Sequence, residues 1–297
     1  MSAGEVVLYT GSGGGSVRFN GTADNPAVLK GQNQTLSSGL SISGSHFVVE
    51  GFGFYNLSSS IGVSASYGVV RNNEHGGNNT GTSNGTSMGL SNAHDVVYYK
   101  NSIHNLAQDD GSSEVDYIGF VPRHNAYSIW YLDNDVYRLG GDAIRTGTNV
   151  SRLGAGNTPP VDIYIAGNRF HDMGENPIDL KYATEIFISG NELYGAQGSV
   201  SSSGELITIH ESGDNVYIYD NNMHHGSRGV VTATSGGGAE YIEVDGNNMH
   251  DLSQYGVYNR GGGHADVTYN TFTNVSNPIQ TNSDNGSTTY SFGNIFN

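Results

Sequence analysis

The sequence predicts an all-β solenoid of short parallel strands, and three observations lead to this fold class. A motif recurs along the chain, alternating apolar residues precede it, and no segment of useful length has the apolar spacing of a helix. The motif reads Asn, any residue, an apolar residue and then often His or Tyr, and its Asn residues are Asn101, Asn134, Asn168, Asn191, Asn221, Asn247, Asn270 and Asn294. Successive Asn are 33, 34, 23, 30, 26, 23 and 24 residues apart, so the repeat length varies while the local motif is kept.

Each repeat contains a strand directly before the Asn. The residues five and three positions before it are apolar, as in Ile163 and Ile165 before Asn168. Such period-two alternation indicates a strand with one buried face. About ten residues after most Asn comes another alternating run, such as Ile178-Asp-Leu180. Each repeat therefore holds about three short strands and three turns.

A coil of about 23 residues with three strands is the unit of a right-handed parallel β-helix, here with about ten coils. Asn suits the tight turn, because it tolerates left-handed backbone and its amide can hydrogen-bond to the amide of the next coil. We predict that residues 1–297 form one domain. Gly-, Ser- and Asn-rich stretches predict loops near 76–92, 145–160 and 196–204.

Composition and charge exclude several classes of protein. The chain has 12 Lys and Arg against 28 Asp and Glu, a net charge of −16, which argues against a nucleic-acid partner. It has no cysteine, so a disulfide scaffold is excluded. No apolar run reaches the 18 residues of a membrane span. An anionic ligand must therefore be held by a local cluster of cations in a repulsive field.

Stacked coils place equivalent residues in columns. Four positions before the Asn, an outward residue is aromatic in four consecutive repeats: Trp130, Tyr164, Phe187 and Tyr217. This aromatic stripe predicts sugar stacking, a subunit interface, or a face covered by another segment of the chain. The His and Tyr residues after the Asn predict a stacked ladder rather than a metal site, because they alternate along the chain instead of converging on one point.

The strand about ten residues after the Asn carries a mixed-charge face. Four of the chain's 12 cations lie on it, and these are Arg145, Lys181, Arg228 and Arg260. The acids Asp142, Glu175, Asp179 and Glu205 lie on the same face, together with His210 and Tyr258. Alignment of the strands predicts that Lys181 and His210 stack on adjacent coils. The face is either a functional site or a solvated surface with salt bridges between coils.

Several segments resemble polysaccharide lyase family 6, the alginate lyases and chondroitinase B, which are parallel β-helices. The segments 21–30 (GTADNPAVLK) and 43–51 (SGSHFVVEG) resemble the family's N-terminal coils, and 140–147 (GGDAIRTG) is similar to its GGETIRIG segment. The resemblance covers roughly residues 4–225.

Two further coils match the family's catalytic strands. The segment 174–181 (GENPIDLK) lies where the family has a Glu-rich strand ending in its catalytic Lys, and 206–210 (LITIH) lies where a strand ends in its catalytic Arg. The chain departs from the family pattern in its Glu-to-Lys spacing, which is one residue shorter, and at two positions. Pro177 stands where the family has its second calcium-binding Glu, and His210 stands in place of the Arg.

The resemblance implies a lyase that cleaves a uronate-containing acidic polysaccharide by β-elimination. Lys181 would be the base, its pKa lowered by neighbouring positive charge, and His210 would protonate the leaving oxygen or neutralise the carboxylate. Arg145 or a calcium ion would stabilise the enolate. The expected calcium ligands are Glu175, Asp179 and Asp142. The expected substrate-binding residues are Arg228, Arg260, Tyr258, Glu205 and Trp130.

Two other interpretations remain open. A β-helix glycoside hydrolase would use Asp179 and Glu205 as its carboxylate pair. A non-catalytic phage tailspike or surface glycan-binding β-helix would be a trimer, whereas a lyase would be a monomer. No signal peptide is visible after Met1. We expect an extracellular or periplasmic location, with a signal peptide removed, for a lyase, and the virion surface for a phage protein.

Overall fold

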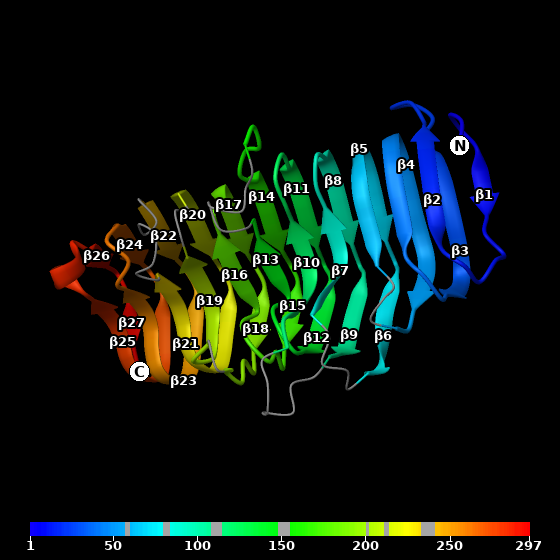
Figure 1. The fold of residues 1–297 in the computed structure, drawn as a ribbon. Helices are drawn as coiled ribbons and strands as arrows, with labels where there is room; N and C mark the ends of the chain where they lie inside the picture. Colours follow the sequence, from blue (N-terminus) through cyan, green and yellow to red (C-terminus); the bar gives the residue numbers. More distant parts are fainter. Residues whose placement is uncertain are drawn as a thin grey trace.

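The computed structural model describes residues 1–56, 60–79, 84–107, 115–147, 155–199, 202–210, 214–232 and 241–297. Its strands pair in parallel from coil to coil, and Figure 1 shows the coils stacked from the N-terminal to the C-terminal end of the molecule. The predicted all-β parallel β-helix is confirmed. Within the described ranges, no helix is long and apolar enough to span a membrane.

The strands form three faces, which we call sheets 1, 2 and 3. Sheet 1 contains β1 (Val6–Leu8), β8 (His94–Tyr99), β11 (Tyr127–Leu132), β14 (Val161–Ala166), β17 (Thr184–Ser189), β20 (Asp214–Tyr219), β22 (Tyr241–Asp245), β24 (His264–Thr268) and β26 (Thr288–Phe292). Sheet 2 contains β6 (Glu74–Asn79), β9 (Ser102–Leu106), β12 (Asp135–Leu139), β15 (Arg169–His171), β18 (Glu192–Tyr194) and β27 (Ile295–Phe296). Sheet 3 contains β2 (Gly15–Asn20), β7 (Gly85–Leu90), β10 (Tyr117–Pro122), β13 (Ile144–Thr146), β16 (Ile178–Lys181) and β19 (Glu205–His210).

Longer strands continue from one sheet into the next. They are β3 (Ala27–Leu36), β4 (Leu40–Phe54), β5 (Ile61–Arg71), β21 (Asn222–Thr232), β23 (Asn248–Asn259) and β25 (Thr271–Thr281). The second parts of β21, β23 and β25 extend sheet 3, because Arg228 pairs with Glu205 of β19 and then with Tyr255 of β23. A short 3-10 helix, η2 (Ser283–Asn285), lies between β25 and β26.

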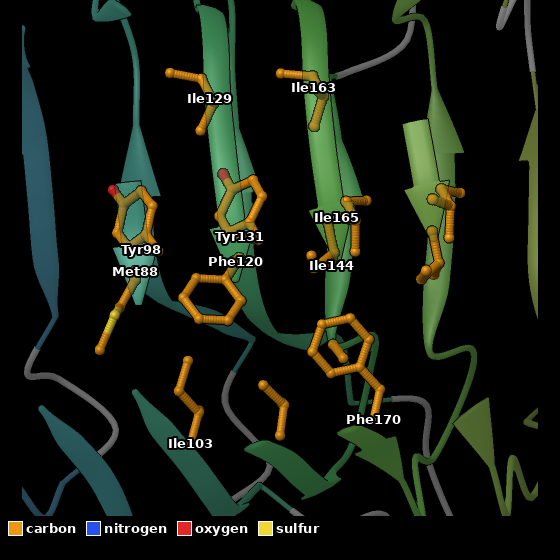
Figure 2. Close-up of a cluster of buried hydrophobic side chains, with 14 of the residues drawn as sticks. Met88, Tyr98, Ile103, Phe120, Ile129, Tyr131, Ile144, Ile163, Ile165 and Phe170 are labelled. Atoms are coloured by element: carbon orange, nitrogen blue, oxygen red, sulfur yellow. The ribbon is translucent and has the colours of Figure 1, made fainter. Parts of the chain in front are cut away.

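The core lies inside the coils, where all three sheets direct their apolar residues. Ile163 and Ile165 are fully buried, as their alternation predicts. Figure 2 shows Tyr98 and Tyr131 side by side above Phe120, and the two tyrosine rings stack with centroids 5.2 Å apart. Equivalent residues of successive coils thus pack on one another, which makes the core a column of layers.

The repeated Asn residues form a hydrogen-bonded ladder inside the molecule. In each coil the backbone N–H and the side-chain Nδ2 both donate to Oδ1 of the next Asn, as Asn134 does to Asn168 at 2.9 Å for both bonds. Nδ2 of Asn168 also donates to the carbonyl of Tyr131, at 2.8 Å. The ladder begins at Asn73, one coil earlier than the motif predicted. The motif does not include Asn73, because the buried residue two positions later is His75 rather than an apolar residue.

The turn between sheets 1 and 2 differs from the sequence-based prediction in one respect. The ladder Asn does not adopt the left-handed backbone conformation; the residue before it does, as in Asp133 (φ 53°) and Gly167 (φ 65°). This residue bends the chain at the corner between sheets 1 and 2, and the Asn side chain points inward and is about 1% exposed. From β5 onward, every connection from sheet 1 to sheet 2 has two residues, the left-handed residue and the ladder Asn.

The predicted loop at 76–92 is wrong in large part. Residues up to Asn79 belong to β6, and Gly85–Leu90 form β7, because pairing with β9 and β10 outweighs the low strand propensity of Gly, Ser and Asn. The described parts of the other two predicted loops are 145–147 and 155–160, and 196–199 and 202–204. Arg145 and Thr146 belong to β13, and the remaining described residues of these loops contain no strand. Residues 200–201 lie outside the described residues. Residues 80–83 and 148–154 also lie outside the described residues.

Candidate functional site

The outward residues of sheet 3 align from coil to coil. Ile144 of β13 pairs with Ile178 of β16, which pairs with Ile207 of β19. Lys181 and His210 therefore lie opposite each other on adjacent strands, as the sequence alignment predicts. Their side chains are each about 30% exposed, so both reach the surface of the sheet.

The carboxylate of Asp179 lies between these two side chains. Its Oδ2 is 2.7 Å from Nζ of Lys181, and its Oδ1 is 3.6 Å from Nε2 of His210. The Asp179 side chain is only 3% exposed, so solvent screens these interactions weakly. One buried carboxylate thus positions an ammonium group and an imidazole on neighbouring coils.

The prediction that neighbouring positive charge lowers the pKa of Lys181 is wrong. Burial disfavours the charged ammonium group, but the ion pair and hydrogen bond with Asp179, together with Asp142, outweigh burial and raise the pKa of Lys181. Arg145 has only a smaller opposing effect. Lys181 is therefore a cation in the resting protein.

Three carboxyl groups form a cluster beside this pair. One oxygen each of Asp116, Asp142 and Glu175 lies within 4.8 Å of the others. Asp142 is fully buried, and its Oδ1 accepts hydrogen bonds from the backbone N–H and Nδ2 of Asn176, both at 3.3 Å. Burial, Asp179 and Glu175 raise the pKa of Asp142 well above its ordinary range.

Two buried oxygens of this cluster have no hydrogen-bond partner. They are Oδ2 of Asp142 and Oδ1 of Asp116, in the part of the chain that the structure describes. Orphaned buried oxygens carry a large desolvation penalty, which a bound cation relieves. The cluster is therefore the best candidate metal site among the described residues.

The cluster differs from the predicted calcium ligands by one residue. Asp142 and Glu175 come together as predicted, but Asp179 is not part of the group. Asp116 takes its place and was missed, because it precedes β10 in a coil that follows no obvious motif. It stands four residues before Phe120, whereas Asp142 stands only two before the paired Ile144, so alignment of the strands does not place the two at one position.

Arg145 connects the cluster to Asp179. Its Nη1 donates to Oδ2 of Asp116 at 2.6 Å. Burial disfavours its charge, but Asp142, Asp116 and Asp179 outweigh burial and raise the pKa of Arg145. The guanidinium group thus partly compensates the buried acids.

The later coils of sheet 3 carry the remaining predicted site residues. Nη1 of Arg228 lies 2.7 Å from Oε1 of Glu205, and its guanidinium lies 5.8 Å from the ring of Tyr255. The Arg260 guanidinium lies 5.7 Å from the ring of Tyr258. These residues extend a basic and aromatic surface beyond His210 along the same sheet.

The carboxylate pair required by a hydrolase is already occupied. Asp179 is bound by Lys181, and Glu205 is bound by Arg228 and by Ser202 and Ser203, which donate to its Oε2 at 3.0 and 2.8 Å. Both side chains are less than a tenth exposed. Each carboxylate is therefore held as the buried partner of a cation, whereas a hydrolase needs one of the two as a proton donor.

Trp130 does not join the site, because it lies on sheet 1 rather than on sheet 3. The predicted aromatic stripe is present, with centroids 5.4 Å apart for Trp130 and Tyr164 and 4.9 Å for Tyr164 and Phe187. Adjacent rings are nearly parallel and cover one another's faces, so a sugar ring has little face to stack on. The predicted ladder on sheet 2 is confirmed, with His171 stacked on Tyr137 and Tyr194 at 4.8 Å.

Comparison with known proteins gives a likeness of fold. No family model matches the sequence, and no curated protein matches it either. The chain is similar to an alginate lyase from Paenibacillus sp. str. FPU-7, with a TM-score of 0.63, 16% identity, and 95% of this chain and 93% of that chain covered. It is also similar to the A-module of the mannuronan C-5 epimerase AlgE6 from Azotobacter vinelandii, with a TM-score of 0.56, 14% identity, and 99% and 91% covered.

A third similar structure is the catalytic domain of a GH87 α-1,3-glucanase in complex with tetrasaccharides. Its TM-score is 0.56, with 13% identity, and the match covers 98% of this chain and 62% of that chain. All three identities are low. The likeness shows the parallel β-helix fold.

Proposed function

We propose that the protein is a polysaccharide lyase that cleaves an acidic, uronate-containing polysaccharide by β-elimination on sheet 3. The observation that carries this proposal is the sharing of buried Asp179 by Lys181 and His210 on adjacent coils. The named activities of the similar structures support it, because an alginate lyase and a mannuronan epimerase both act on polysaccharides.

Lys181 neutralises the carboxylate of the uronate. Asp179 keeps Lys181 protonated and fixes its position, so its ammonium group can pair with a substrate carboxylate above the sheet. Neutralisation of that carboxylate lets the adjacent C5–H lose its proton more readily, since the developing negative charge is stabilised. The resemblance assigned Lys181 the role of base, and the ion pair argues for this different role.

His210 acts as the base. The ring nitrogen that does not face Asp179 takes the C5 proton, the C–H electron pair forms the C4=C5 double bond, and the C4–O bond breaks. The imidazolium then returns the proton to the leaving glycosidic oxygen. Oδ1 of Asp179 stabilises the imidazolium during this interval.

We also propose that the acidic cluster binds calcium through Asp116, Asp142 and Glu175. Calcium takes oxygen ligands at about 2.4 Å, so ligands on opposite sides of the ion lie about 4.8 Å apart. The separation of the three oxygens fits that limit. A bound ion would supply positive charge next to Arg145, which donates to Asp116 of the cluster.

Substrate binding extends along sheet 3 beyond the reacting pair. Arg228 presents its guanidinium next to Tyr255, and Arg260 presents its own next to Tyr258. We propose that these residues hold sugars of the polymer through charge-assisted hydrogen bonds and ring contacts.

A lyase assay on alginate, pectate and chondroitin-type polymers tests the function, because only elimination makes a conjugated double bond that absorbs in the ultraviolet. We expect absorbing product from one of these polymers, a loss of about 10²-fold or more for His210→Ala, and partial recovery of that variant with added imidazole. Arg138→Ala, which removes an exposed arginine from sheet 2, serves as the matched control.

Two results would overturn the proposal. One is the absence of absorbing product from every acidic polymer while products without a double bond appear, as from a hydrolase or an epimerase. The other is full turnover by a folded His210→Ala variant.

A further inference from the structure

Arg123 occupies the same outward column as the reacting pair. Four side chains of this column stand three residues after paired positions of sheet 3, namely Arg123 after Phe120, Lys181 after Ile178, His210 after Ile207 and Arg260 after Val257. Arg123 lies two coils before Lys181, and Arg260 lies two coils after His210. With strands about 4.8 Å apart, each arginine is about 10 Å along the axis from the nearer member of the pair.

The two arginines differ from the other cations of this face. Arg145, Lys181 and Arg228 each form an ion pair with a carboxylate. Arg123 and Arg260 form none with the residues that the structure describes, although the chain carries a net charge of −16. Their charges are thus left for a ligand.

The neutral contacts of these two arginines leave most of their donors available. Nη2 of Arg123 donates to Oγ1 of Thr86 at 3.3 Å, and Nε of Arg260 donates to the carbonyl of Thr232 at 3.3 Å. A guanidinium has five N–H donors in a planar fork that matches a carboxylate or a sulfate. Each arginine therefore retains donors for an anionic group.

Sheet 3 is hollowed on the N-terminal side of Arg123. A groove of about 430 Å³ crosses β4, β5 and β7 and ends at Arg123, with Ser41, Ser43, Gly62, Ser64 and Thr86 in its lining. Small side chains leave space above the strands, and their hydroxyl groups can bond to sugar hydroxyls. The chain of a glycan thus has room to continue past Arg123.

We propose that Arg123 binds an anionic group of the glycan on the N-terminal side of the Lys181–His210 pair, while Arg260 binds one on the C-terminal side. The polymer then lies along the axis of the solenoid, and the two arginines bind its anionic groups on both sides of the bond that is cleaved. This inference rests on the proposed function of the pair, and it assigns to Arg123 a specificity role that the sequence did not suggest.

Binding measured apart from cleavage tests the proposal. Calorimetry on the full-length His210→Ala protein would use uronate, sulfated and neutral oligosaccharides of equal length. We expect Arg123→Ala to weaken binding of the anionic ligands about tenfold, an effect typical of one lost charge-assisted contact, and to leave neutral ligands unaffected. Comparison of the uronate and sulfated ligands shows whether Arg123 prefers a carboxylate or a sulfate group. Arg138→Ala is the charge-matched control.

A steric variant tests the direction of the glycan without changing charge. A Cβ at Gly62 meets only the carbonyl oxygen of Leu40, at 3.9 Å, so Gly62→Phe fills the groove without disturbing the strands. We expect it to weaken binding of long oligosaccharides and to spare short ones that reach only the Lys181–His210 pair.

The outcomes separate this inference from the proposed function. If a folded Arg123→Ala variant binds the anionic oligosaccharides with unchanged affinity, the inference is overturned, even if the wild-type protein catalyses β-elimination. Weakened binding by Arg123→Ala supports it even if no unsaturated product forms, in which case only the proposed reaction fails.

Discussion

Asp179 is the residue on which the proposed chemistry of sheet 3 depends. It is buried, it is two positions before Lys181 on the same strand, and it faces His210 across the strand pair. Its contribution is to position and charge other groups, since its Oδ2 forms an ion pair with Lys181 and its Oδ1 lies 3.6 Å from Nε2 of His210. Its role can therefore be distinguished from a purely structural one by the pH dependence of activity.

We expect Asp179→Asn to lower turnover about 10²-fold and to move the alkaline limb of the pH–rate profile to lower pH. Asp179 raises the pKa of Lys181. Without it, burial dominates, the pKa of Lys181 falls, and the ammonium group loses its proton at a lower pH. Steady-state rates between pH 6 and about 11 would measure this. An unmoved alkaline limb in a folded variant would contradict the assignment of Lys181 as the cation.

Asp142 allows the calcium site to be tested without an activity assay. Addition of Ca²⁺ to the chelator-treated protein should raise its melting temperature, because an ion that binds only the folded state stabilises it. Asp142→Asn retains the side-chain shape but removes one charged ligand, so its melting temperature should respond to Ca²⁺ much less. Equal responses of the wild type and the variant would exclude Asp142 as a ligand.

At the scale of the structural element, the Asn ladder joins each coil to the next. Asn168 accepts from Asn134, donates to Tyr131, and donates to Asn191 from both of its nitrogens. The site is about 1% exposed, so water cannot replace these bonds. The ladder thus couples neighbouring coils through polar contacts as well as through core packing.

We expect Asn168→Ala to lower the free energy of unfolding by about 3 kcal/mol, because it leaves several buried donors and acceptors unsatisfied. Asn294→Ala, at the last and half-exposed position of the ladder, should cost about 1 kcal/mol, since water can reach the groups that it exposes. Chemical denaturation of both variants measures the difference. Equal losses would mean that the ladder contributes through chain geometry rather than through buried hydrogen bonds.

The element scale also shows why the ladder could be predicted but its turn could not. The Asn spacing and the alternating residues before it reflect contacts between consecutive coils, which a local pattern records. The left-handed residue before each Asn is variously Asn, Asp, Gly, Lys or Tyr, so its conformation leaves no single signature. Likewise β6 and β7 are strands because of their neighbours rather than their own composition.

At the scale of the whole molecule, the sequence predicted the column on sheet 3 but not its electrostatics. Lys181 and His210 followed from strand alignment alone, because the register is parallel and regular. The membership of Asp116 in the acidic cluster and the charge state of Lys181 depend on which buried groups approach each other between coils. Those distances are set by side-chain conformation, which a linear pattern does not contain.

The two-residue turn between sheets 1 and 2 differs from the other connections of the coils in the constancy of its length. From β5 onward that turn has two residues, whereas the connections that border sheet 3 range from none, where β21, β23 and β25 continue from sheet 2 into sheet 3, to fourteen between β13 and β14. The connections of variable length thus lie at the rims of the face that carries Lys181 and His210, while the corner between sheets 1 and 2 has one length from β5 onward. In a solenoid of this kind, the connections that border sheet 3 can be replaced, and the ligand preference of that face changed, without altering the turns and the Asn ladder that fix the register of the coils.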